Sequence, residues 1–305
     1  MPRSRRPVLN AAVLGRPVAH SLSPLLHTAA YRALGLDDWR YGAHDLGADE
    51  LATWVGERDG SWRGLSLTMP LKEAALQVAT TASGTARLTG AANTLVRRDD
   101  LGWDADNTDV AGIIGALAGV SHGGTATLLG SGATARSAAV AMARLGAREV
   151  QVAARNATSA AEVVALLEAL DVRARAVPLE QWAQEPAGIV VSTLPPVAGA
   201  AAAAALAAGA VTGAVTGAVT GAASGATAWA GATLLDVVYA DWPTPLARAA
   251  TGSGLQVVSG LDMLVHQAAE QFRLFTGHEA PVEAMFAAGR AALGRTVPDD
   301  RGPAR

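Results

Sequence analysis

The chain has 305 residues, more than one hydrophobic core usually supports, so we expect two compact domains. Its formal charge of −3 and a lone basic cluster within residues 3–6 give no electrostatic footprint for nucleic acid. No run of large apolar residues reaches membrane length, and the N-terminal tail lacks the apolar core of a secretory signal. The absence of cysteine excludes disulfides and thiolate chemistry. We therefore expect a cytoplasmic protein with no nucleic-acid partner and no membrane association.

In the first third of the chain, short apolar runs alternate with helix signals. Residues 8–14 are apolar and end at a glycine, which is typical of a buried strand entering a loop. The dipeptide Ser23-Pro24 predicts an N-cap and first helical residue, with the helix running to about Leu34. Lys72 is expected in the first turn of another helix. A helix over 110–117 could bridge the two domains.

From residue 125 the pattern is that of a nucleotide-binding βαβ unit. It predicts a strand over 125–129, a glycine turn at 130–132, a helix over 133–145 and a strand over 149–153. Further expected elements are a helix over about 160–170, a polar connection, strands over 189–191, 234–238 and 257–258, and helices between 260 and about 293. The Ala/Gly/Thr-rich stretch 199–233 predicts a loose helix in a variable insertion that buries little.

The glycine turn is a candidate cofactor site. In the order Gly130, Ser131, Gly132, Ala133, Thr134, it lies where backbone N–H groups and a helix dipole favour a pyrophosphate. The alternative is a turn that only joins a strand to a helix. Arg155 follows the next strand and can face a 2′-phosphate, with no acidic residue at 154–156 to bind a free ribose hydroxyl. This favours NADP, although a solvated loop arginine is the plainer interpretation of Arg155.

Lys72 and Asp109 are the candidate catalytic pair. Hydride transfer between a carbinol and a ketone needs a group that carries the oxygen's proton, and a lysine beside a carboxylate can be tuned for this. A cation in a first helical turn is disfavoured by the dipole, so helix stability does not explain Lys72. Plainer alternatives are a surface lysine, an N-cap or first-turn acid at 109, a turn residue at Asn93, and turn or cap formers at Ser21 and Ser23.

Five motifs stand in a fixed order between about residues 8 and 293. They are Gly15 to Pro24 (GRPVAHSLSP), Leu67 to Lys72 (LTMPLK), Ala92 to Leu95 (ANTL), Asp106 to Asp109 (DNTD) and Ser259 to Ala268 (SGLDMLVHQA). Together they resemble the shikimate dehydrogenase family, and five ordered motifs are far more specific than any one of them. Ser66 departs from that family's pattern, which usually has Asn at this position.

The resemblance implies roles for individual residues. Lys72 and Asp109 would form the catalytic pair, and Ser21 and Ser23 would bind the substrate carboxylate. The full implied substrate-binding set is Ser21, Ser23, Thr68, Lys72, Asn93, Asp109, Tyr239 and Gln267. The implied cofactor-binding set is Gly130, Ser131, Gly132, Ala133, Thr134, Arg155, Val237 and Gly260. No metal is needed for this chemistry, and the histidines have no second ligand at suitable helical spacing.

The expected fold is α/β with two domains. An N-terminal α/β substrate-binding domain would span 1–109 and be completed by a C-terminal helical return over 261–293. A Rossmann-type NADP-binding domain would span 110–260, with a tail at 294–305 and the active site in the cleft between the domains.

The implied reaction is the reversible NADPH-dependent reduction of 3-dehydroshikimate to shikimate, a step of aromatic amino acid biosynthesis. Two alternatives stay open: an NAD-dependent quinate/shikimate dehydrogenase, and a non-catalytic paralogue that senses nucleotide and ligand. A sensor needs no proton carrier, so the presence of both Lys72 and Asp109 argues against the second. The expected partners are a small-molecule substrate and, as a candidate, a second copy in a homodimer.

Overall fold

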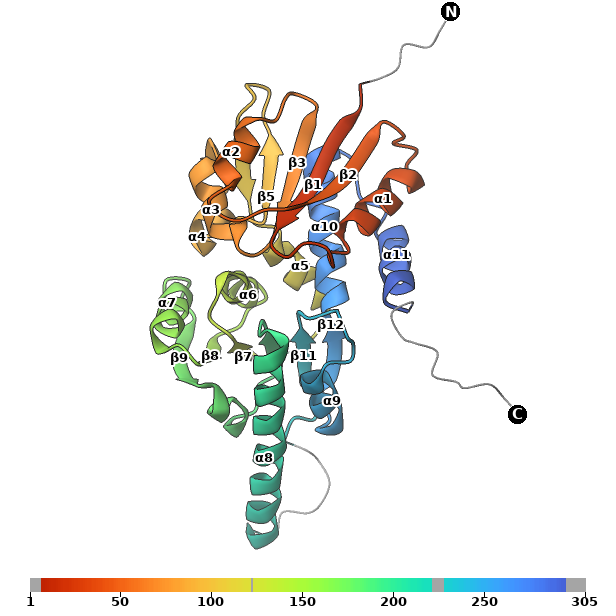
Figure 1. Cartoon of the computed structure of the whole chain (residues 1–305). Coiled ribbons are helices and arrows are strands. Elements are labelled where there is room, and N and C mark those ends of the chain that lie inside the picture. The colour runs from red at the N-terminus through yellow and green to blue at the C-terminus, as the bar shows by residue number, and fades with distance from the viewer. Residues whose placement is uncertain (1–6, 122, 221–227, 295–305) are drawn as a thin grey trace, which may run out of the picture. The chain divides into compact units, whose positions relative to one another are not determined.

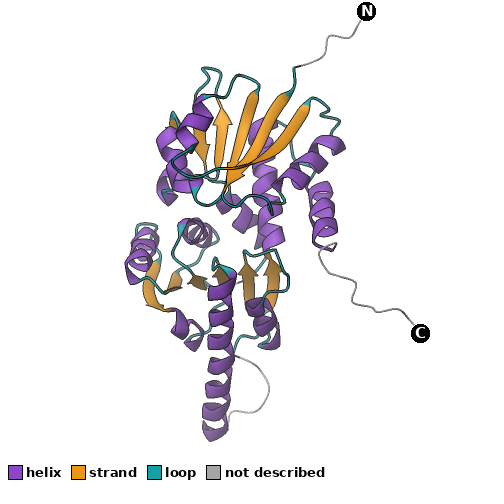
Figure 2. Cartoon of the chain, in the orientation of Figure 1, coloured by secondary structure: helices purple, strands orange, loops and turns teal. Residues whose placement is uncertain are grey.

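The computed structural model describes residues 7–121, 123–220 and 228–294, and its backbone forms two six-stranded sheets (Figures 1 and 2). The chain divides into two units, Met1–Thr108 with Val265–Arg305, and Asp109–Leu264. The strands are β1 Leu9–Gly15, β2 Trp39–Asp45, β3 Trp62–Leu67, β4 Thr81–Ala82, β5 Thr94–Arg97, β6 Trp103–Asp106, β7 Thr125–Leu129, β8 Glu149–Ala154, β9 Arg173–Pro178, β10 Ile189–Ser192, β11 Thr233–Asp236 and β12 Gln256–Ser259. The helices are α1 Ser23–Ala33, α2 Leu51–Gly56, α3 Leu71–Val78, α4 Gly84–Thr89, α5 Asp109–Ala116, α6 Ala133–Arg144, α7 Ala157–Glu168, the 3₁₀ helix η1 Leu179–Gln184, α8 Pro196–Thr220, α9 Pro245–Gly252, α10 Gly260–Thr276 and α11 Val282–Gly294.

The sheet of the first unit has the order β2-β1-β3-β5-β6-β4. Its first three strands are parallel, whereas β5 runs antiparallel to both of its neighbours. Alternation along β3 separates two faces, because successive side chains of a strand point to opposite sides. Leu65 and Leu67 join the core that includes residues of α2 and α3. Gly64 instead faces α10, where an added Cβ would lie 2.0 Å from the Phe275 ring.

The sheet of the second unit is parallel throughout and has the order β12-β11-β10-β7-β8-β9. Counted from β7 as the first strand, this is the doubly wound order 6-5-4-1-2-3 of dinucleotide-binding folds. The strand order reverses between β7 and β10, which is where such folds bind their ligands. The apolar runs that predicted these strands are buried, with Leu128, Val150 and Val191 all fully inside. The expected α/β class with a Rossmann-type unit is confirmed.

Two local expectations are wrong. The Ser23 side chain does not cap α1, because the helix already begins at Ser23, and the Ser23 backbone N–H instead donates to Ser21 Oγ at 3.3 Å. The polar connection after α7 contains strand β9, an exposed edge strand whose alternating Arg and Ala residues show no apolar run. The helix α5 begins at Asp109, the first residue of the second unit, and Val110 and Ile113 pack in the core of that unit.

The Ala-rich helix α8 buries more than its composition indicated. Ala202 and Leu206 are fully buried, and the Trp182 indole donates a hydrogen bond to the Ala202 carbonyl at 2.9 Å. Small side chains allow this close approach because they let a large aromatic ring fill the space. The end of the repeat, 221–227, lies outside the described residues. Across the described parts of the chain, we find no helix with the length and apolar character required to cross a bilayer.

Candidate active site

Lys72 is positioned by the end of β3. The backbone there passes close to the end of β1, since a Cβ on Gly15 would lie 2.2 Å from Thr68 Cγ2 and 2.9 Å from the Met69 carbonyl oxygen. The chain then enters α3, in which Lys72 is the second residue, as expected. The Lys72 carbonyl accepts a hydrogen bond from the Ala92 N–H at 2.7 Å. This places the lysine backbone directly beside the segment that carries Asn93.

Asn93 is a hub that joins three of the sequence motifs. Its Nδ2 donates to Thr108 Oγ1 at 3.0 Å and to Gln267 Oε1 at 3.3 Å, while its Oδ1 accepts from the Thr108 N–H at 2.8 Å. Asn93 is buried, and in such a low-dielectric environment the loss of one hydrogen-bond partner costs more free energy than it does at the surface. The structure therefore brings Asn93 and Gln267 together within the first unit and places them beside the helix that carries Lys72.

Gln271 and Tyr41 also belong to this network, and neither was singled out from the sequence. Gln271 Nε2 donates to the Asn93 carbonyl and to Thr94 Oγ1, both at 3.0 Å. Its Oε1 accepts from Ser66 Oγ at 2.6 Å, and Ser66 in turn accepts from the Tyr41 hydroxyl at 2.6 Å. The available signal was the spacing of Gln267 and Gln271, which lie four residues apart and so share one helix face.

His27 contacts the same network through Tyr41. Its ring stacks on Tyr41 with centroids 4.1 Å apart and an interplanar angle of 12°. Burial lowers the pKa of His27 to about 3, so its imidazole is neutral at physiological pH. Burial also raises the pKa of Tyr41, and hydrogen bonds to Ser66 and Ser23 oppose that rise. Ser23 is thus tied to the Tyr41 side of the network, with Ser21 two residues earlier and half-buried.

In the second unit, the glycine turn follows β7 at the point of strand-order reversal. Gly130 has φ +112°, and a Cβ there would lie 2.4 Å from Thr193 Oγ1, so glycine is required. Thr193 itself donates to the Leu129 carbonyl at 2.9 Å. Gly132 is the N-cap of α6 without any side-chain cap, and a Cβ on it would meet open space. A helix N-terminus with this space in front of it fits the phosphates of a dinucleotide.

Arg155 is exposed directly after β8, at the same carboxyl edge of the sheet. The next residue, Asn156, caps α7 by accepting from the backbone N–H groups of Thr158 and Ser159 at 3.0 and 3.2 Å. The hydroxyls of Ser131 and Ser159 lie 2.7 Å apart and join the glycine turn to the first turn of α7. Ser159 and Thr193 support the turn and were not predicted, because single hydroxyl residues carry no spacing signal.

Gly260 and Val237 lie against one another. A Cβ on Gly260 would be 2.2 Å from the Val237 carbonyl oxygen, so α10 begins in close contact with the loop after β11. Tyr239 is half-buried in that loop, and Asp109 is buried as the first residue of α5. Lys72 belongs to the first unit and Asp109 to the second.

Together these features define a class: a dehydrogenase with a Rossmann-type unit and a separate α/β unit that carries a buried polar network. Two family models match the chain, the shikimate dehydrogenase substrate binding domain over residues 13–95 and the shikimate 5′-dehydrogenase C-terminal domain over residues 260–288. The chain belongs to the shikimate dehydrogenase family.

Individual relatives are similar over nearly their full length. Shikimate dehydrogenase (NADP(+)) of Anaeromyxobacter sp. (strain Fw109-5) is 38% identical over 288 residues, covering 93% of this chain and 96% of the relative. The crystal structure of Mycobacterium tuberculosis shikimate dehydrogenase is 44% identical, with a TM-score of 0.80 over 93% of this chain and 99% of that chain. The Thermus thermophilus enzyme in complex with NADP(H) and shikimate is 32% identical, with a TM-score of 0.76 over 94% of this chain and 100% of that chain. The family expected from the five motifs is confirmed.

Proposed function

We propose that this chain catalyses the reversible, NADPH-dependent reduction of 3-dehydroshikimate to shikimate in aromatic amino acid biosynthesis. The observation that carries the proposal is the extent of the similarity. A relative named shikimate dehydrogenase (NADP(+)) is matched over 96% of its length, so both units of the fold are included. A protein that retained only a nucleotide-binding fold would match over one unit alone.

The chemical step assigned to this chain is proton transfer. NADPH supplies the hydride that reduces the ring ketone carbon. Lys72 Nζ would donate a proton to the ketone oxygen as it becomes a hydroxyl, and we assign Asp109 as the second member of the catalytic pair. In the reverse direction the same amine would accept the hydroxyl proton. The position of Lys72 at the start of α3, beside Asn93, supports this role.

Most of the assigned substrate-binding residues lie in the first unit, and the polar network there supports the assignment. The interactions of Asn93 with Thr108 and Gln267 hold its amide in one orientation, which lowers the cost of ordering it around a substrate. We assign polar contacts to the ring hydroxyls or the carboxylate to Thr68, Asn93, Tyr239 and Gln267. We assign the carboxylate to the hydroxyls of Ser21 and Ser23, which lie near the start of α1.

Cofactor binding is assigned to the second unit. Gly130 to Thr134 would hold the pyrophosphate at the open N-terminus of α6, and Arg155 would pair with the 2′-phosphate. Val237 and Gly260, in contact at the carboxyl ends of β11 and β12, would lie beside the nicotinamide. All of these positions follow the carboxyl ends of parallel strands, where doubly wound folds bind dinucleotides.

Initial-rate assays on the purified chain would test the proposal, with shikimate and quinate each offered with NADP and with NAD. We expect shikimate oxidation with NADP to be the fastest of the four reactions. If quinate oxidation with NAD is the fastest instead, the chain is an NAD-dependent quinate/shikimate dehydrogenase. Binding without turnover of either substrate would indicate a sensor.

We also propose that the protein acts in the cytoplasm and forms a homodimer. A chain without cysteine is compatible with a reducing compartment. The strand β2 lies at the edge of its sheet, and an edge strand offers unpaired backbone groups to a second copy. Light scattering coupled to size exclusion would give the mass in solution, and the mass of one chain would contradict the dimer.

A further inference from the structure

A cavity of about 460 Å³ lies in the first unit. It is lined by residues around α2, by the end of α3, and by Arg97 and the hairpin that follows it. Because β5 runs antiparallel to β3, Thr94 pairs with Ser66 while Arg97 stands at the opposite end of the strand. The cavity is therefore at the end of the sheet away from Asn93, and none of the proposed substrate residues lines it.

The charged residues that line this cavity are both arginines, Arg58 and Arg97, and no carboxylate among the described residues lines it. Arg97 makes no ion pair within the described part of the chain. Its Nη2 donates to the carbonyl oxygens of Arg58 and Asp59, and its Nε is buried without a hydrogen-bond partner. Arg58 pairs at 3.0 Å with Glu57, a carboxylate that is 64% exposed. Burial lowers the pKa of Arg97; the nearby Asp59 carboxylate raises this pKa, and the Arg63 guanidinium lowers it.

Both guanidinium groups are held in place by aromatic rings. Arg58 lies 4.3 Å from the centroid of Trp54, and its Nε donates to the Trp54 carbonyl at 2.9 Å. Arg97 lies 4.6 Å from the centroid of Trp103, which is itself buried. An arginine stacked in this way loses little side-chain freedom on binding, and its N–H groups that are not already bonded can donate to a carboxylate.

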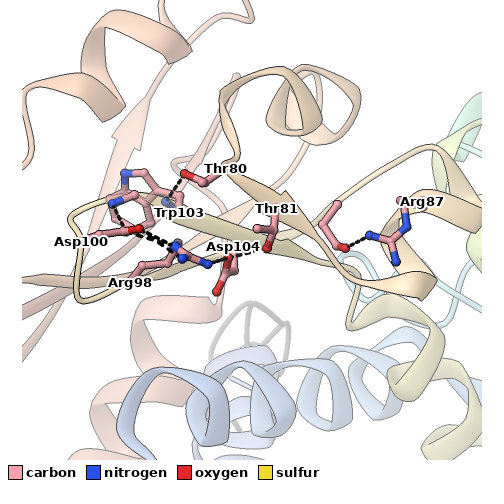
Figure 3. A network of polar contacts seen from close by, with 9 residues as sticks. Thr80, Thr81, Arg87, Arg98, Asp100, Trp103 and Asp104 are labelled. Carbon is pink, nitrogen blue, oxygen red and sulfur yellow. Dashed lines mark hydrogen bonds and ion pairs between the residues drawn. The ribbon is translucent and has the colours of Figure 1, made fainter.

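The hairpin wall of the cavity is rigidified by a network of polar contacts (Figure 3). Arg98 is held by Asp100 at 3.0 Å and by Asp104 at 2.9 Å, and Thr81 donates to the same Asp104. Thr80 Oγ1 accepts from the Trp103 backbone N–H at 3.3 Å. The remaining wall is largely apolar and includes Val55 and Val78. The cavity thus combines two arginine side chains with a largely apolar wall.

We propose that this Arg58/Arg97 cavity is a second binding site for a small organic carboxylate, separate from the substrate site. The carboxylate would pair with the two guanidinium groups, and an apolar body would lie against Val55, Val78 and the Trp103 side. The proposal does not depend on the reaction assigned above, because no residue is shared between the two sites.

Fluorine NMR of 4-fluorobenzoate with the full chain tests the proposal, first without shikimate and then with it, so that binding displaced from the substrate carboxylate site is separated from the rest. We expect binding to the wild-type protein, a weakening of about tenfold or more in Arg58→Gln and in Arg97→Gln, and no change in Arg40→Gln, an exposed arginine elsewhere in the unit. The uncharged isostere 4-fluorobenzamide should not bind.

Three results would overturn the proposal: no binding to wild type below about 10 mM, equal affinity in Arg58→Gln and wild type, or equal binding of the benzamide. Arg97→Gln also removes hydrogen bonds to two backbone carbonyls, which lowers stability. If that variant does not fold, Arg58→Gln alone tests the proposal, provided that its circular dichroism spectrum matches that of the wild type.

Discussion

The Ser66 hydroxyl donates a 2.6 Å hydrogen bond to the side-chain carbonyl of Gln271, 205 positions later in the chain. Through this bond, α10 is tied to the middle of the first sheet. The same glutamine donates to the Asn93 carbonyl, so one side chain of the C-terminal segment positions two segments of the N-terminal part. These bonds explain physically how α10 packs as part of the first unit, although the two are far apart in the sequence.

Replacing Gln271 with Ala should destabilise the protein by about 2–5 kcal/mol, because it removes the buried hydrogen bonds to Ser66, Thr94 and the Asn93 carbonyl and leaves a cavity in their place. Urea unfolding followed by circular dichroism would measure the change in the free energy of unfolding. The matched control is Gln256→Ala, which alters an exposed glutamine and should change stability by less than about 0.5 kcal/mol. Equal effects of the two substitutions would show that the Gln271 bonds contribute nothing specific.

Lys72→Ala should lower turnover by about 10²–10⁴-fold, the usual contribution of a general acid–base group. The affinity for shikimate should change much less, because the hydroxyls and amides of the network remain. Steady-state kinetics at saturating NADP and shikimate would separate the two effects. An unchanged turnover number would exclude Lys72 as the proton carrier and leave it as an ordinary surface lysine.

Arg155→Ala should weaken NADP binding while leaving NAD binding nearly unchanged, because only NADP carries a 2′-phosphate for the guanidinium. We expect the preference for NADP to shrink by about ten- to a hundredfold. Fluorescence titration of both cofactors into wild type and variant measures this directly. If the variant keeps its full preference for NADP over NAD, a group other than Arg155 binds the 2′-phosphate.

His27 should make stability depend on pH. Its folded-state pKa of about 3 is below its ordinary value of 6.5, so the unfolded chain binds more protons between these values. The stabilising contribution is therefore complete above about pH 6.5 and is lost as the pH falls towards 3, at up to about 1.4 kcal/mol per pH unit.

The variant His27→Leu isolates this effect, since it removes the titrating ring from the core. The difference in unfolding free energy between wild type and His27→Leu should shift in favour of the variant from pH 7 to pH 5. His278→Leu, at an exposed histidine, should show no such trend. A pH-independent difference for His27→Leu would mean that the ring titrates normally in the folded protein.

Much of the second unit follows from local sequence. The apolar runs over 125–129 and 149–153 are strands because they can bury both faces in a parallel sheet, and Gly130 ends the first of them in a conformation that other residues avoid. Strand β9 was missed because an edge strand buries little and needs no apolar run. The burial of α8 was missed because Ala202 and Leu206 become core residues only when Trp182 packs on them.

The sequence by itself determined the family, the doubly wound unit and the candidate site residues, because motifs and periodicity are local properties of the chain. Only the tertiary structure decided which of those polar residues meet. The bonds of Asn93 to Gln267 and of Ser66 to Gln271 join positions 174 and 205 residues apart, and Arg58 and Arg97 line one cavity from separate segments. Such pairings depend on strand order and on which face of α10 contacts the sheet, and no spacing in the sequence encodes them.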